Sequence, residues 1–272
     1  MSPEPVVISL DAEHEVSGLW MAPEAADACL VLAHGAGAGM AHKSMTAIAD
    51  GLAERGIATL RYNFAYMERG SRRPDAPALA HAAVRAAVAQ AARLAPDLPL
   101  FAGGRSFGGR MTSQAQAAQP LPGVLGLVFF AFPFHPPAKP GVERAQHLAD
   151  VSIPQLFLQG SRDEFARLDL LTLTVEGLGD LATLKLLDGA DHAFHVPAKS
   201  GRRDADVLSE MLDAARDWIL ARRCSPSGGA VGEADCGGMR RAPSVALTRA
   251  TSPNRGGSGC SGAWRILSRF WP

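Results

Sequence analysis

Residues 98–110 read LPLFAGGRSFGGR. The apolar start predicts a buried strand over Leu98–Ala102, and the apolar spacing that follows predicts a helix over Phe107–Ala118. Between the two lies a Gly-x-Ser-x-Gly pattern centred on Ser106. Such a turn needs small flanking residues, because strand and helix approach closely while the serine adopts a strained backbone and exposes its hydroxyl. We therefore expect Ser106 to be a nucleophile; the alternative is a serine that only caps the helix.

The same alternation of elements extends to both sides of this stretch. Apolar and β-branched runs predict further strands at Val6–Leu10, Ala28–Ala33, Ile57–Tyr62, Val124–Phe132, Pro154–Leu158 and Ala182–Leu187. Helical spacing of apolar residues occurs at Met45–Arg55, Ala78–Leu94 and Ala205–Arg222, and more weakly at Ala166–Leu178. Strands that alternate with helices favour parallel pairing, since a helix is the usual crossover between parallel neighbours. The expected fold class is therefore α/β, with a mostly parallel central sheet and helices on both faces.

A second glycine-rich turn follows the predicted strand Ala28–Ala33, where residues 34–39 read HGAGAG. Small residues at this point let a backbone N–H approach a substrate without a side-chain clash. We expect the N–H groups of Ala36 and Phe107 to form an oxyanion hole, with Gly35 beside the substrate. The rival interpretation is a phosphate-binding loop, but the Walker Gly-Lys-Ser/Thr ending and the Gly-x-Gly-x-x-Gly spacing are both missing.

Two late strands are followed by residues suited to proton transfer. Asp163 comes shortly after one predicted strand, and His192 comes shortly after the next. Together with Ser106 they have the chain order of a Ser-Asp-His triad, in which the histidine takes the serine proton and the aspartate orients the histidine. Asp163 could also serve only as a helix cap. The sequence leaves three other partners open, namely His195 as the base and Asp188 or Asp191 as the acid.

Bulk composition limits the classes of function. The 272 residues carry 27 basic and 27 acidic side chains, so no net charge draws the chain to nucleic acid or to an anionic membrane. No apolar run approaches the roughly 20 residues that cross a bilayer, and the N-terminus lacks the pattern of a signal peptide. We therefore expect a cytoplasmic protein. The four cysteines lack the spacing of a zinc site, and neither a metal nor a cofactor is expected.

The character of the chain changes at residue 223. Residues 1–223 contain every predicted strand and helix and form one expected domain. Residues 224–272 are rich in Ser, Gly, Pro and Arg and show no sustained periodicity. Such a composition buries too little apolar surface to offset its ordering entropy. We expect this segment to be a disordered, low-complexity C-terminal tail.

Four motifs resemble those of a known family: HGAG at 34–37, NFxYME at 63–68, GGRSFGGR at 103–110 and FPFHPP at 132–137. On these motifs the chain resembles the small, lidless α/β hydrolases related to the dienelactone hydrolases. It is similar in particular to the group that includes the hydrolase-like domain of a eukaryotic histone-acetyltransferase-complex subunit.

The resemblance spans roughly residues 5–222 and implies an α/β-hydrolase fold without a lid domain. It also implies that Ser106, Asp163 and His192 are the triad positions. It brings no substrate with it. Dienelactone hydrolases proper use a cysteine nucleophile where this chain has Ser106, which argues against their particular substrate.

The linker between the predicted strands Val124–Phe132 and Pro154–Leu158 is only about twenty residues long, too short for the helical lid that many hydrolases insert there. An open, shallow cleft that suits small acyl groups is therefore expected. Its walls are predicted to include Phe107, Phe132, Phe134 and His135.

We expect Arg105, Phe134 and His135 to contact the substrate together with Gly35. The loop 66–73 contains further arginines, which with Arg105 could receive an anionic substrate group. The alternative for this loop is an ordinary solvated surface.

Two classes of function remain. The first is a serine hydrolase that acts on a small carboxylic ester, thioester or related acyl substrate through an acyl-enzyme intermediate. The second is a catalytically silent hydrolase-like module for protein interaction. The complete triad order favours the enzyme, because a scaffold has no need of all three residues. The expected partner is a small acyl substrate, and the sequence does not determine the oligomeric state.

Overall fold

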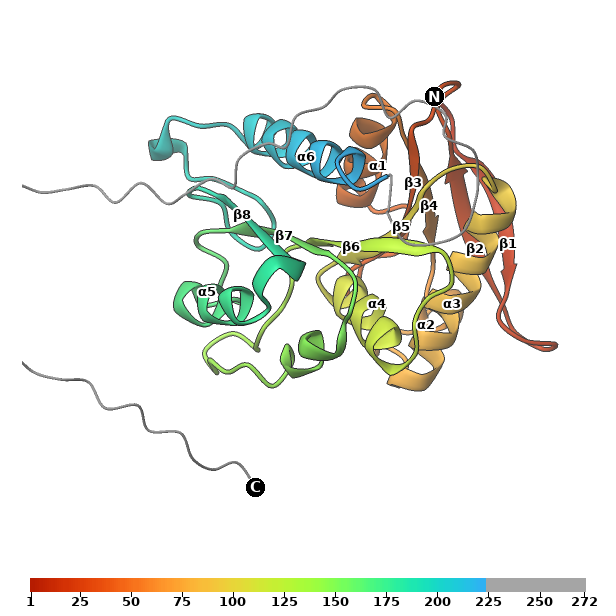
Figure 1. Cartoon of the computed structure of the whole chain (residues 1–272), viewed down its shortest axis with the longest axis horizontal. Coiled ribbons are helices and arrows are strands. Elements are labelled where there is room, and N and C mark those ends of the chain that lie inside the picture. The colour runs from red at the N-terminus through yellow and green to blue at the C-terminus, as the bar shows by residue number, and fades with distance from the viewer. Residues whose placement is uncertain (224–272) are drawn as a thin grey trace, which may run out of the picture. The chain divides into compact units, whose positions relative to one another are not determined.

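The structure, a computed structural model, describes residues 1–223. Its centre is an eight-stranded sheet in the order β1-β2-β4-β3-β5-β6-β7-β8 (Figure 1). The strands are β1 (Glu4–Ser9), β2 (Glu15–Met21), β3 (Ala28–Ala33), β4 (Ile57–Tyr62), β5 (Leu100–Arg105), β6 (Val124–Phe130), β7 (Gln155–Gly160) and β8 (Ala182–Leu187). The hairpin β1-β2 joins the sheet antiparallel, and β3 to β8 are all parallel. The predicted mostly parallel α/β fold is confirmed.

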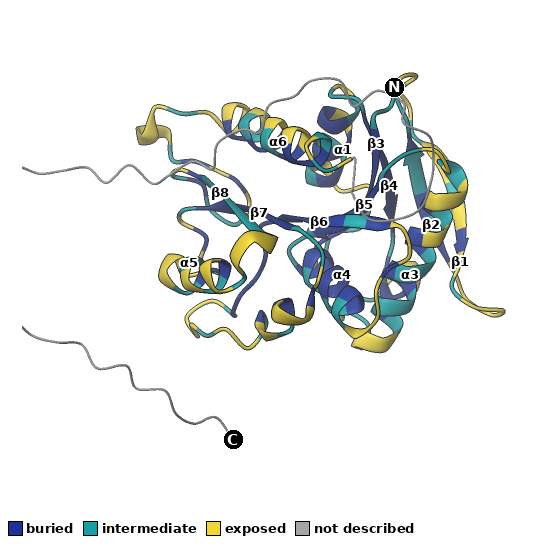
Figure 2. Cartoon of the chain, viewed as in Figure 1, coloured by how far each residue is buried: buried dark blue, intermediate teal, exposed yellow. Residues whose placement is uncertain are grey.

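Helices cover both faces of the sheet. They are α1 (Lys43–Ala53), α2 (Ala65–Glu68), α3 (Pro77–Leu94), α4 (Phe107–Ala118), α5 (Leu168–Gly177) and α6 (Asp204–Leu220), with short 3-10 turns η1 (Gln146–Asp150), η2 (Gly179–Leu181) and η3 (Ala198–Ser200). α1 and α6 lie against one face, and α3, α4 and α5 against the other (Figure 1). Each face has its own apolar cluster, and Figure 2 shows the sheet and the inner sides of these helices as buried. Burial of both sheet faces explains why the parallel strands are almost continuously apolar.

The predicted helices agree with the observed ones to within two residues at each end. Two elements were not predicted, the strand β2 and the short helix α2. β2 has Gly18 in its middle, which weakens a strand pattern in the sequence. The structure explains the glycine, because a Cβ there would lie 2.7 Å from the side chain of Val6 on β1.

The strands next to the glycine-rich turn end at different residues from those predicted. β5 continues past Ala102 to Arg105, so that Gly103 belongs to the strand. A Cβ at Gly103 would lie only 1.9 Å from the carbonyl oxygen of Val128 on β6, and only glycine permits this close pairing. β6 is shorter than predicted, because Ala131 has a φ of 58° and turns the chain out of the sheet. Because β3, β5, β7 and β8 run parallel, their carboxyl ends lie along the same edge of the sheet.

The segment between β6 and β7 contains one 3-10 turn, η1, and no inserted helical domain within the described part of the chain. The expectation of a fold without a lid is confirmed. No helix within residues 1–223 has both the length and the apolar character to span a membrane. The predicted tail, residues 224–272, lies outside the described residues.

Gly108, in the first turn of α4, provides a test of this packing. A Cβ there would lie 2.5 Å from the carbonyl oxygen of Ala33 and 2.6 Å from that of His34. Backbone atoms cannot yield as a flexible side chain can, so we expect Gly108→Ala to lower the free energy of unfolding by about 1–3 kcal/mol in urea denaturation.

Gly177, the last residue of α5, is the matched control, because a Cβ there meets no atom within 4 Å. Gly177→Ala should leave the free energy of unfolding unchanged or raise it by up to about 1 kcal/mol. Equal stabilities of the two variants would contradict the packing argument.

Candidate active site

Ser106 lies on the sharp turn between β5 and α4. Its φ of 50° and ψ of −114° belong to a region that residues other than glycine rarely adopt. The turn is held by a hydrogen bond of 2.9 Å from the Ser106 N–H to the carbonyl oxygen of Phe130. The Ser106 side chain makes no capping hydrogen bond to α4, so the structure does not support the alternative role of a helix cap.

Ser106, His192 and Asp163 form a continuous chain of hydrogen bonds. The His192 Nε2 lies 2.9 Å from the Ser106 Oγ, and the His192 Nδ1 lies 2.7 Å from the Asp163 Oδ2. The Asp163 side chain is fully buried, whereas the His192 side chain is 18% exposed. A proton on Nδ1 is held by the carboxylate, which leaves the Nε2 lone pair directed at the serine hydroxyl.

The carboxylate of Asp163 has two further hydrogen bonds. Its Oδ1 accepts the Phe165 N–H at 2.8 Å, so Asp163 also stabilises the turn that follows it. Its Oδ2 accepts the side-chain amide of Gln159 at 2.5 Å, and the Gln159 Oε1 in turn accepts the Phe132 N–H at 2.9 Å. Sequence reasoning missed Gln159. The available signal was a polar residue at the end of an apolar strand, where a buried amide requires partners.

His192 is also held from its other sides. The ring of Phe165 lies against it, with centroids 4.2 Å apart and planes inclined by 34°. The guanidinium of Arg105 donates a hydrogen bond of 3.2 Å to the carbonyl oxygen of His192. Burial lowers the pKa of Arg105, while the nearby carboxylates of Asp163 and Asp191 oppose this shift. Arg105 thus helps to hold the loop that carries His192 in place.

The alternative triad partners are engaged elsewhere. His195 is exposed and paired with Asp204 at 2.9 Å. Asp191 accepts the backbone N–H groups of Ala193 and His195, which shapes the loop around His192. Asp188 is an exposed acceptor for Ser161 at 3.4 Å. None of these three lies in the hydrogen-bonded chain with Ser106.

Ala36 and Phe107, the expected oxyanion donors, line the same cavity as Ser106. Their backbone N–H groups have no hydrogen-bond acceptor within residues 1–223. The loop that carries Ala36 is fixed on both sides. The Tyr66 hydroxyl accepts the Gly37 N–H at 3.3 Å, and the buried His34 bridges the carbonyl oxygen of Gly35 and the N–H of Phe64. Burial lowers the pKa of His34, which favours the neutral ring that this bridge requires.

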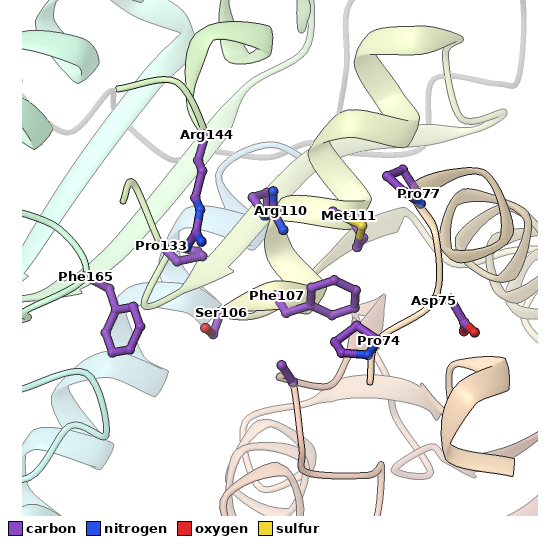
Figure 3. A pocket seen from close by; sticks show the side chains of 11 residues that line it. Pro74, Asp75, Pro77, Ser106, Phe107, Arg110, Met111, Pro133, Arg144 and Phe165 are labelled. Atoms are coloured by element: carbon purple, nitrogen blue, oxygen red, sulfur yellow. The ribbon is translucent and has the colours of Figure 1, made fainter. Parts of the chain in front are cut away.

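A cavity of about 350 Å³ opens beside Ser106. Figure 3 shows Ser106 between Phe107 and Phe165, with Arg110 and Arg144 on the adjoining wall. The complete lining consists of Ala36, Pro74, Asp75, Pro77, Ser106, Phe107, Arg110, Met111, Pro133, Arg144 and Phe165. Most of the wall residues were not predicted, because contacts between segments distant in sequence decide which loop and helix side chains face the cavity.

The four predicted substrate-binding residues do not line this cavity. Gly35 lies directly behind it, where a Cβ would be 3.8 Å from the Cβ of Ser106. Phe134 is fully buried against Phe132 and Phe157, so neither Phe134 nor Phe132 forms the expected wall.

His135 is also buried, and its Nε2 accepts the Arg167 N–H at 2.9 Å. Its backbone N–H donates to the carbonyl oxygen of Phe165 at 3.0 Å. This placement corrects the expectation of direct contact between the substrate and Arg105, Phe134 or His135. These three residues support the loops that surround the cavity.

Comparison with known proteins agrees with this architecture. The sequence pattern of the alpha/beta hydrolase domain matches residues 26–220. The chain is similar to a dienelactone hydrolase from Anabaena variabilis, at 19% identity over 82% of this chain and 100% of the other, with a TM-score of 0.65.

Two further solved structures are similar to a comparable degree. One is a serine hydrolase without a lid from Xanthomonas campestris, at 21% identity over 83% of this chain and 98% of the other, with a TM-score of 0.63. The second is an alpha-beta serine hydrolase homologue from Coxiella burnetii, at 20% identity over 81% of this chain and 97% of the other, with a TM-score of 0.61. These structures share the fold, and the sequence match covers nearly all of the described domain. The chain therefore belongs to the family of alpha/beta hydrolase domains.

Proposed function

We propose that the protein is a serine hydrolase that cleaves small carboxylic esters or thioesters through an acyl-enzyme intermediate on Ser106. The observation that carries this proposal is the hydrogen-bonded chain from Ser106 through His192 to Asp163, which opens onto a cavity of about 350 Å³. Its geometry meets the requirement for an activated serine, since each bond lies within the range of an ordinary hydrogen bond.

The chemistry then follows in two stages. The Ser106 Oγ attacks the carbonyl carbon of the substrate while the His192 Nε2 takes the hydroxyl proton, and Asp163 stabilises the resulting imidazolium. The N–H groups of Ala36 and Phe107 receive the negative charge on the carbonyl oxygen. His192 gives its proton to the leaving alcohol or thiol, and the acyl group remains on Ser106. A water molecule, deprotonated by His192, releases the acid and restores the serine.

Reaction with a fluorophosphonate probe, measured by intact mass, tests the activated serine. We expect the wild-type protein to gain one adduct, and Ser106→Ala and His192→Ala to lose it, because the probe needs a serine whose proton has an acceptor. Ser209→Ala and His195→Ala, two exposed positions on and near α6, are the matched controls and should label like the wild type. A folded wild-type protein that does not react would favour the silent interaction module.

Asp163→Asn tests the orienting carboxylate with almost no change in volume. An amide at this position favours the wrong histidine tautomer, so we expect kcat to fall by about four orders of magnitude. Asp188→Asn, at an exposed position, should retain the activity of the wild type. An equal loss in both variants, or in neither, would remove Asp163 from the mechanism.

The size of the cavity predicts a preference for short acyl chains. We expect para-nitrophenyl acetate and butyrate to be hydrolysed with a higher kcat/KM than the dodecanoate and hexadecanoate, because about 350 Å³ cannot enclose a long chain. Steady-state kinetics in monomeric substrate solutions checks this order. Faster turnover of the long-chain esters would contradict the proposed substrate class.

A further inference from the structure

Two arginines in the cavity wall have no role in the chemistry described so far. Arg110 lies on α4, one turn after Ser106, and Arg144 lies on the segment that connects β6 to β7. Figure 3 shows both side chains on the wall beside Ser106. Elements that are far apart in sequence thus bring two positive charges to the same side of the candidate nucleophile.

Neither guanidinium is neutralised by an acidic side chain within residues 1–223. The only carboxylate in the lining belongs to Asp75, which is almost fully buried. One of its oxygens pairs with Arg69 at 2.5 Å and the other accepts the Tyr66 N–H at 2.9 Å. Both oxygens of Asp75 therefore already have partners in the neighbouring segment 66–69. Asp75 does not neutralise the charges of Arg110 and Arg144.

The guanidinium of Arg110 is partly buried, so water solvates its positive charge poorly. Its Nε is buried and has no hydrogen-bond partner, and its guanidinium lies over the ring of Phe107 at 5.9 Å from the centroid. Burial lowers the pKa of Arg110, and the like charge of Arg144 lowers it further. A buried donor without an acceptor and two adjacent cations are both unfavourable, unless an anion lies between them.

The neighbouring side chain of His147 does not supply that anion. His147, on η1, lies 2.7 Å from the Ser113 Oγ through its Nε2. Burial and then the charge of Arg110 lower the pKa of His147 to about 4. The ring is therefore neutral near neutral pH, and it adds neither a negative charge to offset the arginines nor a third positive one.

We propose that the substrate carries a carboxylate or a comparable anionic oxygen group, which Arg110 and Arg144 bind beside the scissile carbonyl. This inference rests on the proposed function and specifies its substrate class. A guanidinium offers several donors in a fixed plane that matches a carboxylate. Phe165 and Pro133, which also line the cavity, supply apolar contacts to the remainder of the substrate.

This assignment differs from the arginines that the sequence suggested. Arg69, in the loop 66–73, pairs with Asp75, and Arg105 donates to the carbonyl oxygen of His192. Both are therefore occupied. Within the described domain neither Arg110 nor Arg144 is paired with a carboxylate, and both lie in the lining of the cavity itself.

Matched ester pairs test the proposal by steady-state kinetics. The first pair is para-nitrophenyl hemiglutarate and para-nitrophenyl pentanoate, which differ in a carboxylate on the acyl chain. The second is 3-carboxyphenyl acetate and phenyl acetate, which differ in a carboxylate on the leaving group. We expect the wild-type protein to prefer the anionic member of at least one pair by about tenfold or more in kcat/KM.

Arg110→Gln and Arg144→Gln should each remove that preference, mainly through KM, and leave the neutral esters within about threefold of the wild type. Arg144→Gln is the safer variant, because its side chain is only partly buried in a loop. Arg93→Gln, at an exposed position on α3, is the matched control and should keep the preference. Added salt should weaken the preference for the anionic ester in the wild type.

The outcomes separate the two proposals. Hydrolysis of the neutral esters without preference for either anionic ester overturns the arginine assignment and leaves the hydrolase intact. If no ester is cleaved and Ser106 does not react with fluorophosphonate, the proposed function fails. Binding of glutarate to the wild type and to Arg144→Gln, measured by calorimetry, then decides the assignment without turnover. Weaker binding by the variant supports it, and equal or undetectable binding in both overturns it.

Discussion

The close contact of β5 and α4 with β3 is the constraint on which the site depends. A Cβ at Gly104 or at Gly108 would lie 2.5 Å from the carbonyl oxygen of Ala33, so no side chain fits at either position. The chain must turn sharply from β5 into α4 within this narrow space. The turn is made at Ser106, whose φ is 50°. The hydrogen bond from its N–H to Phe130 connects the strained turn to β6 and helps to hold it in place. The serine hydroxyl is thereby directed to the edge where the parallel strands end.

The buried carboxylate of Asp163 organises the other half of the site. A carboxylate removed from water is stable only when its oxygens accept hydrogen bonds. Gln159, Phe165 and His192 supply them, and the positive charge of Arg105 lies close by. These same contacts fix the orientation of the His192 ring. The groups that compensate the buried charge are therefore also the groups that align the proposed base with the proposed nucleophile.

The segment between β6 and β7 forms a wall of the cavity where other hydrolases carry a lid. Several contacts anchor it, and two of them lie close to the site. His147 contacts Ser113 on α4, and the backbone of His135 bonds to that of Phe165, the residue that lies against His192. Pro133 and Arg144 of this segment thus face Ser106 from a supported backbone. The short connection gives the cavity both its open form and a second positive charge, that of Arg144, in addition to the charge of Arg110 on α4.

The sequence by itself determined the parallel α/β fold and the positions of the helices, since apolar periodicity and glycine-rich turns are local properties. It also placed Ser106, Asp163 and His192 in the correct order at the ends of predicted strands, and the structure brings these three together. Chain order along the sequence is enough for this, because parallel strands deliver their carboxyl ends to one edge of the sheet.

Only the tertiary structure decided which side chains face the cavity beside Ser106. Phe134 and His135 lie in a distinctive sequence motif, yet they are buried supports. Arg110 ends the GGRSFGGR motif and Arg144 lies in no quoted motif, and neither was predicted to bind the substrate. Gln159 likewise gains its role through contacts with Asp163 and Phe132. The direction of a loop side chain depends on packing between residues distant in sequence. Local pattern therefore indicates the order of the strands and turns, and long-range contacts determine which side chains surround the cavity.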